Sequence, residues 1–374
     1  MAKEHFDIVG SFLRPEKLKN ARKDYEAHKI TKAELTEVEN QAIQALVAQE
    51  IAAGLKTVTD GEFRRSYWHL DTFWGFEGIK HTHQKHGYFF HGLETRNDSA
   101  QIEGKIKFNK NHPDLKAFEY LQSLVADQPG ITARQSVPSP AQLYAELVRG
   151  PENIAALHEY YDNDEELVKD IGQAYHDLFI ALYDAGCRDI KLDDCTWGML
   201  ADKDFWKLMT DQYQDIDTLQ KLYLEFNNAA LQNLPADLTI STHVCRGNYA
   251  STWAASGGYE TVAKNLFGKE NVANYYLEFD DDRSGDFAPL AEVTDGKKVV
   301  LGLVTSKKAD LEDQATLKKR IQEASQYVDL ANLSLSTQCG FASTEEGNQL
   351  KEQQQWDKIK LVVDTANQVW GSRS

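Results

Sequence analysis

The two stretches CRDIKLDDC (187–195) and DLTISTHVC (237–245) decide the fold. Each is a short, mostly apolar run that ends in reactive side chains, and residues 211–233 between them have a helical pattern. Short apolar runs joined by a helix are typical of parallel strands, because a parallel connection needs a long crossover. The helical pattern of 165–185, which Gly186 ends, precedes the first run in the same way. Together these stretches predict two strands of one parallel sheet, each preceded by a helix.

The same alternation extends outward in both directions along the chain. Six further strand-like runs are FDIVGSF (6–12), LKTVTDGEF (55–63), ITARQSVP (131–138), ANYYLEFDD (273–281), KKVVLGLV (297–304) and DLANLSLSTQCGF (329–341). Further helical patterns cover 15–54, 311–328 and 347–369. Eight strands that alternate with helices predict an α/β fold, and they fit a (β/α)8 TIM barrel better than an open sheet. We expect residues 1–374 to form a single barrel domain.

Residues 70–118 depart from this alternation and predict an insertion after the second strand. The segment is polar, and GYFFHGLE (87–94) and AQIEGKIKFN (100–109) predict the two strands of a hairpin. We expect the insertion to lie on the active-site face. Because no convincing strand ends at them, a solvated loop fits the histidines of this segment better than a metal site of the amidohydrolase type: His81, His83, His86 and His91.

The charge balance excludes several classes of partner. The chain has 41 Lys and Arg residues against 58 Asp and Glu residues, and its formal net charge of −17 disfavours binding to nucleic acid and to anionic membranes.

No apolar run is long enough to span a bilayer, and MAKEHFDIVG (1–10) lacks the pattern of an export signal, so we expect a cytoplasmic protein. Its cysteines are then expected to be reduced thiols: Cys187, Cys195, Cys245 and Cys339. The oligomeric state is not predicted.

Reactive side chains gather where the predicted strands end, which in such barrels is the active-site face. They are Ser11, Asp60, Glu62, Asp193, Asp194, Cys195, His243, Cys245, Glu278, Asp280 and Cys339. His243 and Cys245 are two residues apart, so they share one face of a strand and would suit zinc. Glu278 and Cys339 are suitable further ligands from other strands. The alternative is that the thiols are small buried residues and His243 is a hydrogen-bonded core histidine.

Six motifs, in this order along the chain, are similar to those of one known family. They are DIVGSFLRP (7–15), TDGEFRR (59–65), KLDD (191–194), THVC (242–245), LEFDDDR (277–283) and STQCG (336–340). Over nearly its whole length the chain resembles the catalytic domain of cobalamin-independent methionine synthase, in the short branch that has a single barrel. The most specific element is the dispersed set of His-x-Cys, Glu and Cys-Gly.

The resemblance implies a zinc-dependent methyltransferase of methionine biosynthesis, in which a zinc-bound homocysteine thiolate takes a methyl group from polyglutamylated 5-methyltetrahydrofolate. The implied zinc ligands are His243, Cys245, Glu278 and Cys339. Ser11 would hold the homocysteine carboxylate, and Glu62 and Asp193 would hold its ammonium group and serve as the catalytic carboxylates. From the residues alone, Glu62 could instead be a turn or N-cap carboxylate and Asp193 a partner of a nearby arginine such as Arg188.

Two segments depart from the family pattern, and both concern the methyl donor. LGLVTSKKADLE (301–312) lacks the family's strand-7 histidine, for which Thr305, Ser306 or Lys307 would substitute. RQSVPSPAQLY (134–144) lacks the tryptophan that stacks on the pterin. Its replacement would be one of Tyr144, Trp68, Trp74, Tyr88, Phe89 and Phe90. The sequence therefore leaves open another methyl donor or another thiol acceptor, and only a local patch such as Lys307 and Lys308 would hold a folate tail.

Two competing interpretations stay open. A glycoside hydrolase barrel would use Glu62 and Glu278, and it needs two carboxyl groups about 5–10 Å apart and no metal. A non-catalytic barrel would hold a structural metal in a closed four-ligand site or bind a small molecule.

Overall fold

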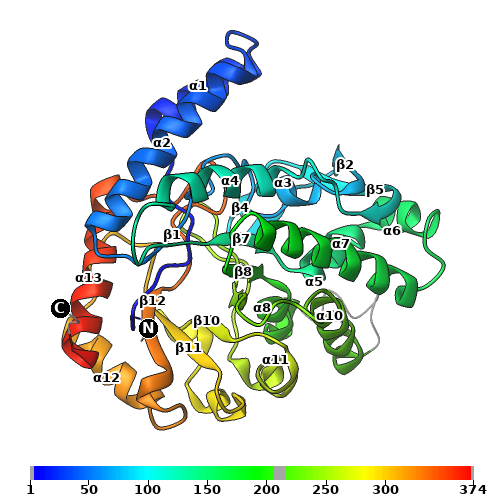
Figure 1. Cartoon of the computed structure of the whole chain (residues 1–374). Coiled ribbons are helices and arrows are strands. Elements are labelled where there is room, and N and C mark those ends of the chain that lie inside the picture. The colour runs from blue at the N-terminus through cyan, green and yellow to red at the C-terminus, as the bar shows by residue number, and fades with distance from the viewer. Residues whose placement is uncertain (1–3, 206–214, 372–374) are drawn as a thin grey trace.

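The centre of the computed structural model, which describes residues 4–205 and 215–371, is a parallel sheet surrounded by helices (Figure 1). Its strands lie in the order β12-β11-β10-β9-β8-β7, so strands that are adjacent in the sheet follow one another along the chain. Every pairing between them is parallel. The strands are β7 (Gln135–Pro138), β8 (Asp189–Asp194), β9 (Thr239–Val244), β10 (Asn274–Glu278), β11 (Lys298–Val304) and β12 (Leu333–Thr337). The parallel α/β architecture predicted from the sequence is confirmed.

Short extended segments flank both edges of this sheet. β1 (Thr57–Val58) pairs in parallel with β6 (Thr132–Ala133), and β6 leads directly into β7. At the other edge, Phe6 forms a single parallel bridge with Leu335 of β12. The first two predicted strands are therefore present as pairing segments, but they are much shorter than the apolar runs at 6–12 and 55–63 indicate.

Helices cover the outside of the sheet (Figure 1). They are α1 (Glu16–Glu26), α2 (Lys32–Ala52), α3 (Leu70–Phe73), α4 (Pro113–Val125), α5 (Pro140–Leu147), α6 (Pro151–His158), α7 (Asp164–Asp184), α8 (Thr196–Ala201), α10 (Ile216–Ala230), α11 (Ala263–Lys269), α12 (Gln314–Ala324) and α13 (Glu352–Trp370). Short 3-10 turns are η1 (Tyr259–Thr261), η2 (Asp282–Ser284), η3 (Ala288–Glu292) and η4 (Leu330–Asn332). Within the described residues, no helix combines the length and apolarity that crossing a membrane requires. Of the helix predicted over 211–233, residues 211–214 lie outside the described part and α10 covers most of the rest.

The prediction of one helix over 15–54 is wrong, because α1 and α2 divide this range. After α1, His28 has a φ of 55°, in the left-handed region that a helix cannot contain. Thr31 then begins α2 with a capping box, in which its side chain accepts from the Glu34 N–H and the Glu34 side chain accepts from the Thr31 N–H. The Thr-x-x-Glu spacing is the local signal for this second start.

The insertion after β1 contains two antiparallel pairs, and its pairing differs from the prediction. Its strands are β2 (Glu77–His83), β3 (Phe89–Phe90), β4 (Leu93–Glu94) and β5 (Asp98–Lys107). β2 pairs with β5 and β3 pairs with β4, so the predicted hairpin between 87–94 and 100–109 is wrong. The loop predicted at His81 and His83 is also wrong, because both lie in β2, where Trp74 packs over the ring of His81. The predicted range further includes the start of α4 at Pro113.

A buried ion-pair network fixes the amino ends of the strands. The guanidinium of Arg134, between β6 and β7, donates to the two carboxylate oxygens of Asp7 at 2.9 and 2.8 Å and to those of Asp189 at 3.0 Å each. Tyr276 of β10 donates its hydroxyl to Asp7 at 2.7 Å. Burial acts to raise the pKa of Asp7, but Arg134 more than offsets this and the pKa is lowered. The network thereby joins the N-terminal segment to three other strand segments.

Replacing Arg134 with Met is expected to destabilise the protein strongly, because the loss of one partner in a buried ion pair costs about 3–5 kcal/mol. Arg188→Ala is the matched control, since Arg188 pairs with Asp237 at 3.0 Å on the surface, where such pairs are worth about 0–1 kcal/mol. Urea unfolding at pH 7 measures both free energies. Equal losses in the two variants would contradict the structural role of this network.

Candidate active site

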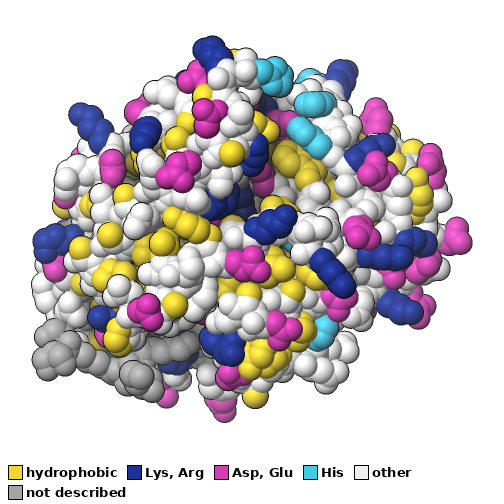
Figure 2. Space-filling model, turned by 45° about the horizontal axis from the view of Figure 1, so that its top comes forward, with side chains coloured by type: hydrophobic (Ala, Val, Ile, Leu, Met, Phe, Trp, Pro, Cys, Tyr) yellow, Lys and Arg dark blue, Asp and Glu magenta, His cyan; other side chains and the backbone are white. Residues whose placement is uncertain are grey.

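A cavity of about 1100 Å³ opens beside the carboxyl ends of the strands, and residues 84–91 of the insertion form part of its wall. Figure 2 shows a hollowed face with histidine side chains gathered to one side of the hollow. Six of the predicted site residues line this cavity: Ser11, Glu62, Asp193, His243, Cys245 and Cys339. The structure therefore brings together, in one cavity, side chains that are widely spaced along the chain.

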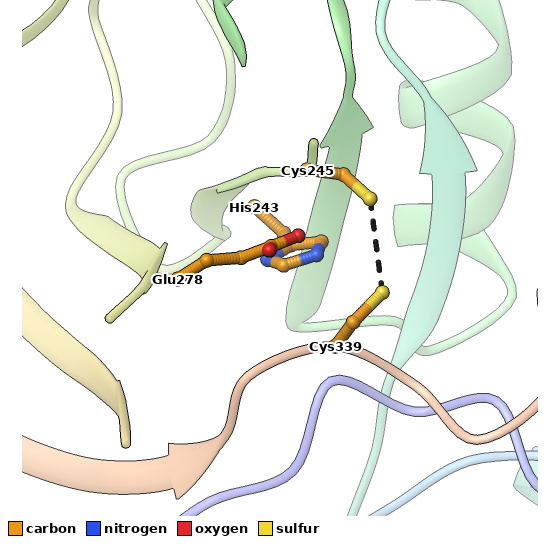
Figure 3. A group of neighbouring side chains, drawn as sticks. All are labelled: His243, Cys245, Glu278 and Cys339. Atoms are coloured by element: carbon orange, nitrogen blue, oxygen red, sulfur yellow. Dashed lines mark hydrogen bonds between the residues drawn. The ribbon is translucent and has the colours of Figure 1, made fainter. Parts of the chain in front are cut away.

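Four buried side chains converge beside this cavity as a candidate metal centre. His243 and Cys245 come from the end of β9, Glu278 ends β10, and Cys339 follows β12 (Figure 3). One possible ligand atom from each residue lies within 4.8 Å of the others, and the two sulfur atoms are 3.7 Å apart. The strand register explains this meeting. His243 is paired with Tyr276 across the β9–β10 ladder, and Glu278 lies two residues beyond Tyr276, on the same face.

The hydrogen bonds around His243 and Glu278 leave one possible metal-ligand atom of each residue without a hydrogen-bond partner. The Nδ1 of His243 lies 3.2 Å from the carbonyl of Tyr276, which can only accept, so Nδ1 carries a proton, and in the neutral imidazole Nε2 keeps a lone pair. One oxygen of Glu278 accepts from the backbone N–H of Arg246 at 2.9 Å. The other oxygen of Glu278 and the Nε2 of His243 are buried without a hydrogen-bond partner. Buried atoms of this kind are normally satisfied, so these residues fit a bound cation.

The thiols of this group also fit a cation. A hydrogen bond with Cys245, together with burial, raises the pKa of Cys339 well above its usual value. A hydrogen bond with Cys195 is the largest of the effects that raise the pKa of Cys245. Without a cation the cysteines are therefore neutral thiols, and a metal ion that binds them must displace their protons.

Cys195 belongs to the same thiol cluster, which the sequence did not indicate. Cys195, Cys245 and Cys339 pack together, and Trp68 and Met199 cover them. The available signal was its position directly after β8, where the strand ends on the active-site face. Cys187 lies before the other end of β8, buried, with its thiol donating to the carbonyl of Asp189 at 3.3 Å, which agrees with a packing role.

The two predicted clamp carboxylates are buried and incompletely paired. Glu62 has a φ of 60°, and both its Oε2 and the Oδ1 of Asp193 lack hydrogen-bond partners. Burial raises the pKa of Glu62 to about 7, with the Asp193 carboxylate adding to this effect and Arg65 opposing it. The example of Arg188 as a partner for Asp193 is wrong, because Arg188 pairs with Asp237. Asp193 instead forms an ion pair with Lys191, at 3.4 Å from its Oδ1. These buried acceptors can bind a cationic group of a ligand.

Ser11 lies against the segment that carries Cys339. Its Oγ accepts from the N–H of Ala342 at 3.3 Å, and a Cβ on Gly340 would stand 1.9 Å from that oxygen. Glycine at 340 is therefore required for this close approach. The contact places the hydroxyl predicted to hold a carboxylate beside the predicted metal ligands.

The structure reduces the number of residues that could contact a methyl donor. Tyr144 is buried and stacked on Phe226 at 4.6 Å, so its ring is already used in the core. Lys307 is buried and does not line the cavity. Trp74 does not line the cavity either. Of the aromatic residues that the sequence offered for stacking on the donor, Trp68, Tyr88, Phe89 and Phe90 line the cavity.

Comparisons with known proteins support the family resemblance of the six sequence motifs. No model of a protein family matches the chain. The uncharacterised protein YxjH of Bacillus subtilis is 41% identical over 365 residues, 97% of this chain and 94% of that protein. A methionine synthase of Saccharolobus solfataricus is 26% identical over 245 residues, which are 65% of this chain and 63% of that protein. A solved structure from Listeria monocytogenes, named as a candidate vitamin-B12-independent methionine synthase, is 37% identical, covers 100% of this chain and 99% of its own, and superposes with a TM-score of 0.78. Since this likeness extends over the full length, the chain belongs to the cobalamin-independent methionine synthase family.

Proposed function

We propose that this protein is a zinc-dependent S-methyltransferase that transfers the methyl group of polyglutamylated 5-methyltetrahydrofolate to the thiol of homocysteine and so forms methionine. The observation that carries the proposal is the convergence on one cavity of a His-Cys-Glu-Cys group and two buried carboxylates, each of which keeps an oxygen without a hydrogen bond. A thiolate-rich metal site alone could be structural, and a carboxylate pair alone could bind any amine. Together they suit an amino acid that carries a thiol.

The chain's own residues would divide the work between the two ends of the acceptor. Zinc held by the four converging side chains would supply a Lewis acid that lowers the pKa of an incoming thiol. Asp193 and ionised Glu62 would bind the ammonium group, and Ser11 would donate its hydroxyl to the carboxylate. Holding both ends of the molecule fixes the direction of the sulfur and reduces the entropy lost on the way to the transition state.

The size and lining of the cavity support a large second substrate with a flat ring. At about 1100 Å³ it is far larger than homocysteine requires. Trp68 lines the cavity and packs on the thiol cluster, so we place the ring of the donor against Trp68, in the role of the missing strand-3 tryptophan. Lys85 and Arg149 also line the cavity and replace Lys307 and Lys308 as the proposed contacts of the folate tail.

We also propose that the strand segments close into one (β/α)8 barrel that forms a single domain over 1–374. The bridge between Phe6 and Leu335 supports closure on one side. On the other side Thr59 donates its hydroxyl to the carbonyl of Gly10 at 2.6 Å, which links the N-terminal segment to the end of β1. The insertion then follows the second strand of the barrel.

The structure favours this function over a glycoside hydrolase. A hydrolase would need Glu278 as a free carboxyl group opposite Glu62. Glu278 instead lies among two thiols and an imidazole, and it accepts a hydrogen bond from the backbone of Arg246. A purely structural metal site would not account for the buried oxygens of Glu62 and Asp193 that accept no hydrogen bond.

Cys339→Ser is expected to remove the tightly bound metal. Protein passed over a chelating resin should retain one zinc per chain, and the variant should retain none, because a serine hydroxyl replaces a thiolate ligand. Cys187→Ser is the matched control, since Cys187 is a buried cysteine outside the group. Elemental analysis of the three proteins measures this, and full zinc retention by Cys339→Ser would refute the ligand assignment.

A methyl-donor assay tests the reaction itself. Methionine formation from homocysteine is compared with triglutamyl and monoglutamyl methyl-folate, a sulfonium donor and a methyl-corrinoid, and we expect the triglutamyl folate to be the best. Trp68→Leu should weaken donor binding about 5- to 150-fold, because stacking on one aromatic ring is worth about 1–3 kcal/mol. Trp370→Leu is the control, since Trp370 stacks on His5 and is not in the cavity wall. Transfer from the corrinoid or sulfonium donor alone would disprove the folate assignment.

The affinity of the wild-type protein for methionine is expected to rise with pH. Because the pKa of Glu62 is about 7, its ionised fraction, and with it the binding of methionine, should increase about tenfold between pH 6 and pH 8. Calorimetric titration measures the binding constant, with 4-methylthiobutanoate, which has no ammonium group, as the control ligand. Glu62→Gln should bind methionine more weakly and with a flat pH profile. If the affinity of Glu62→Gln for methionine still rises with pH as steeply as that of the wild type, Glu62 does not bind the ammonium group.

A further inference from the structure

A second group of metal-binding side chains lies on the insertion and does not include cysteine. His81 and His83 of β2 and Asp98 of β5 each offer a ligand atom, and these atoms lie within 4.8 Å of one another. The Nε2 of His81 is 2.7 Å from Oδ1 of Asp98, and the Nε2 of His83 is 3.4 Å from the same oxygen. None of the three residues lines the cavity. Both imidazoles therefore converge on one carboxylate oxygen at a separate place in the molecule.

The strand pairing builds this convergence. His81 and His83 are two residues apart in β2, so their side chains leave the strand on the same face. Asp98 is paired directly with His83 across the antiparallel ladder, and opposite residues of such a ladder project to the same side. The three side chains are thus brought together by the backbone and not by flexible surface contacts.

The neighbouring residues hold the group in place. The indole of Trp74 packs on the ring of His81 with 4.0 Å between ring centroids, and its Nε1 donates to the carbonyl of Ser99 at 3.1 Å. The Nε of Arg96 lies 3.5 Å from Oδ2 of Asp98, the oxygen that faces away from the histidine contacts. Arg96 is also paired with Glu345 at 2.5 Å, which offsets its positive charge. The contacts of Oδ1 of Asp98 are with the two imidazole nitrogens, so a cation that replaces the shared proton would meet all three ligand atoms.

We propose that His81, His83 and Asp98 bind a divalent transition metal ion of the zinc class. Two imidazole nitrogens and one carboxylate oxygen suit zinc, nickel or copper better than calcium or magnesium, which prefer oxygen ligands. The histidine side chains are 46% and 62% exposed, so water can complete the coordination. The ion would hold β2 and β5 together at the end of the pair from which the connecting residues 84–97 extend. Part of this connection lines the cavity. This site does not depend on the proposed methyl transfer.

The test is a zinc count by equilibrium dialysis at a fixed micromolar free zinc concentration. Full-length wild-type protein should bind two zinc ions, and His83→Ala and Cys339→Ser should each bind one. The double variant should bind none. His86→Ala is the matched control, because His86 is another exposed histidine of the insertion, 56% exposed and paired only with Glu94 among acidic groups of the described chain. It should keep both ions.

The outcomes separate this site from the thiol-containing one. If the thiol site fails to bind zinc, the wild-type count falls to one, but the difference of one ion between wild type and His83→Ala remains. Equal counts in wild type and His83→Ala would overturn the proposal, as would an equal loss in His86→Ala, which would show non-specific binding to exposed histidines. Thermal unfolding of each variant without metal verifies that the fold is retained.

Discussion

The structure depends on one geometric constraint, namely that parallel strands in register end at the same edge of a sheet. His243 is paired with Asp193 on one side and with Tyr276 on the other, so three neighbouring strands present side chains at matched heights. Two residues further along, Cys245 directly follows β9 and Glu278 is the last residue of β10. A slip of one residue in either ladder would turn these side chains to the opposite face and disperse the group.

The same constraint divides the molecule into a stabilising end and a reactive end. At the amino ends, the charges of Asp7, Arg134 and Asp189 are paired through well-formed hydrogen bonds. At the carboxyl ends, Glu62 and Glu278 keep buried oxygens without partners. An unpaired buried acceptor is costly in the free protein, and that cost falls when a cation or an ammonium group binds. This contrast explains why the ligands of the proposed reaction meet at one end only.

Much of this arrangement follows from the sequence, because parallel strands and their ends have local signatures. The runs around KLDD, THVC and STQCG end in the residues that the structure brings together, and the family resemblance is confirmed. The insertion could not be predicted in the same way. Trp74 contacts both strands of the β2–β5 pair, through the ring of His81 and the carbonyl of Ser99, and short polar segments do not reveal such contacts. The sequence places Cys195 at the end of a strand but gives it no role, since its contact with Cys245 and Cys339 is visible only in the structure.

The central claim is that the buried group activates a thiol whose amino-acid end is held by the neighbouring carboxylates. The most direct measurement is the visible spectrum of the cobalt-substituted protein during titration with homocysteine and, separately, with homoserine, which has a hydroxyl in place of the thiol. The account predicts that homocysteine intensifies and shifts the sulfur-to-cobalt charge-transfer band, that homoserine leaves it unchanged, and that the response saturates at one equivalent. A spectrum that does not respond to homocysteine would show a closed, structural metal site and would contradict the account.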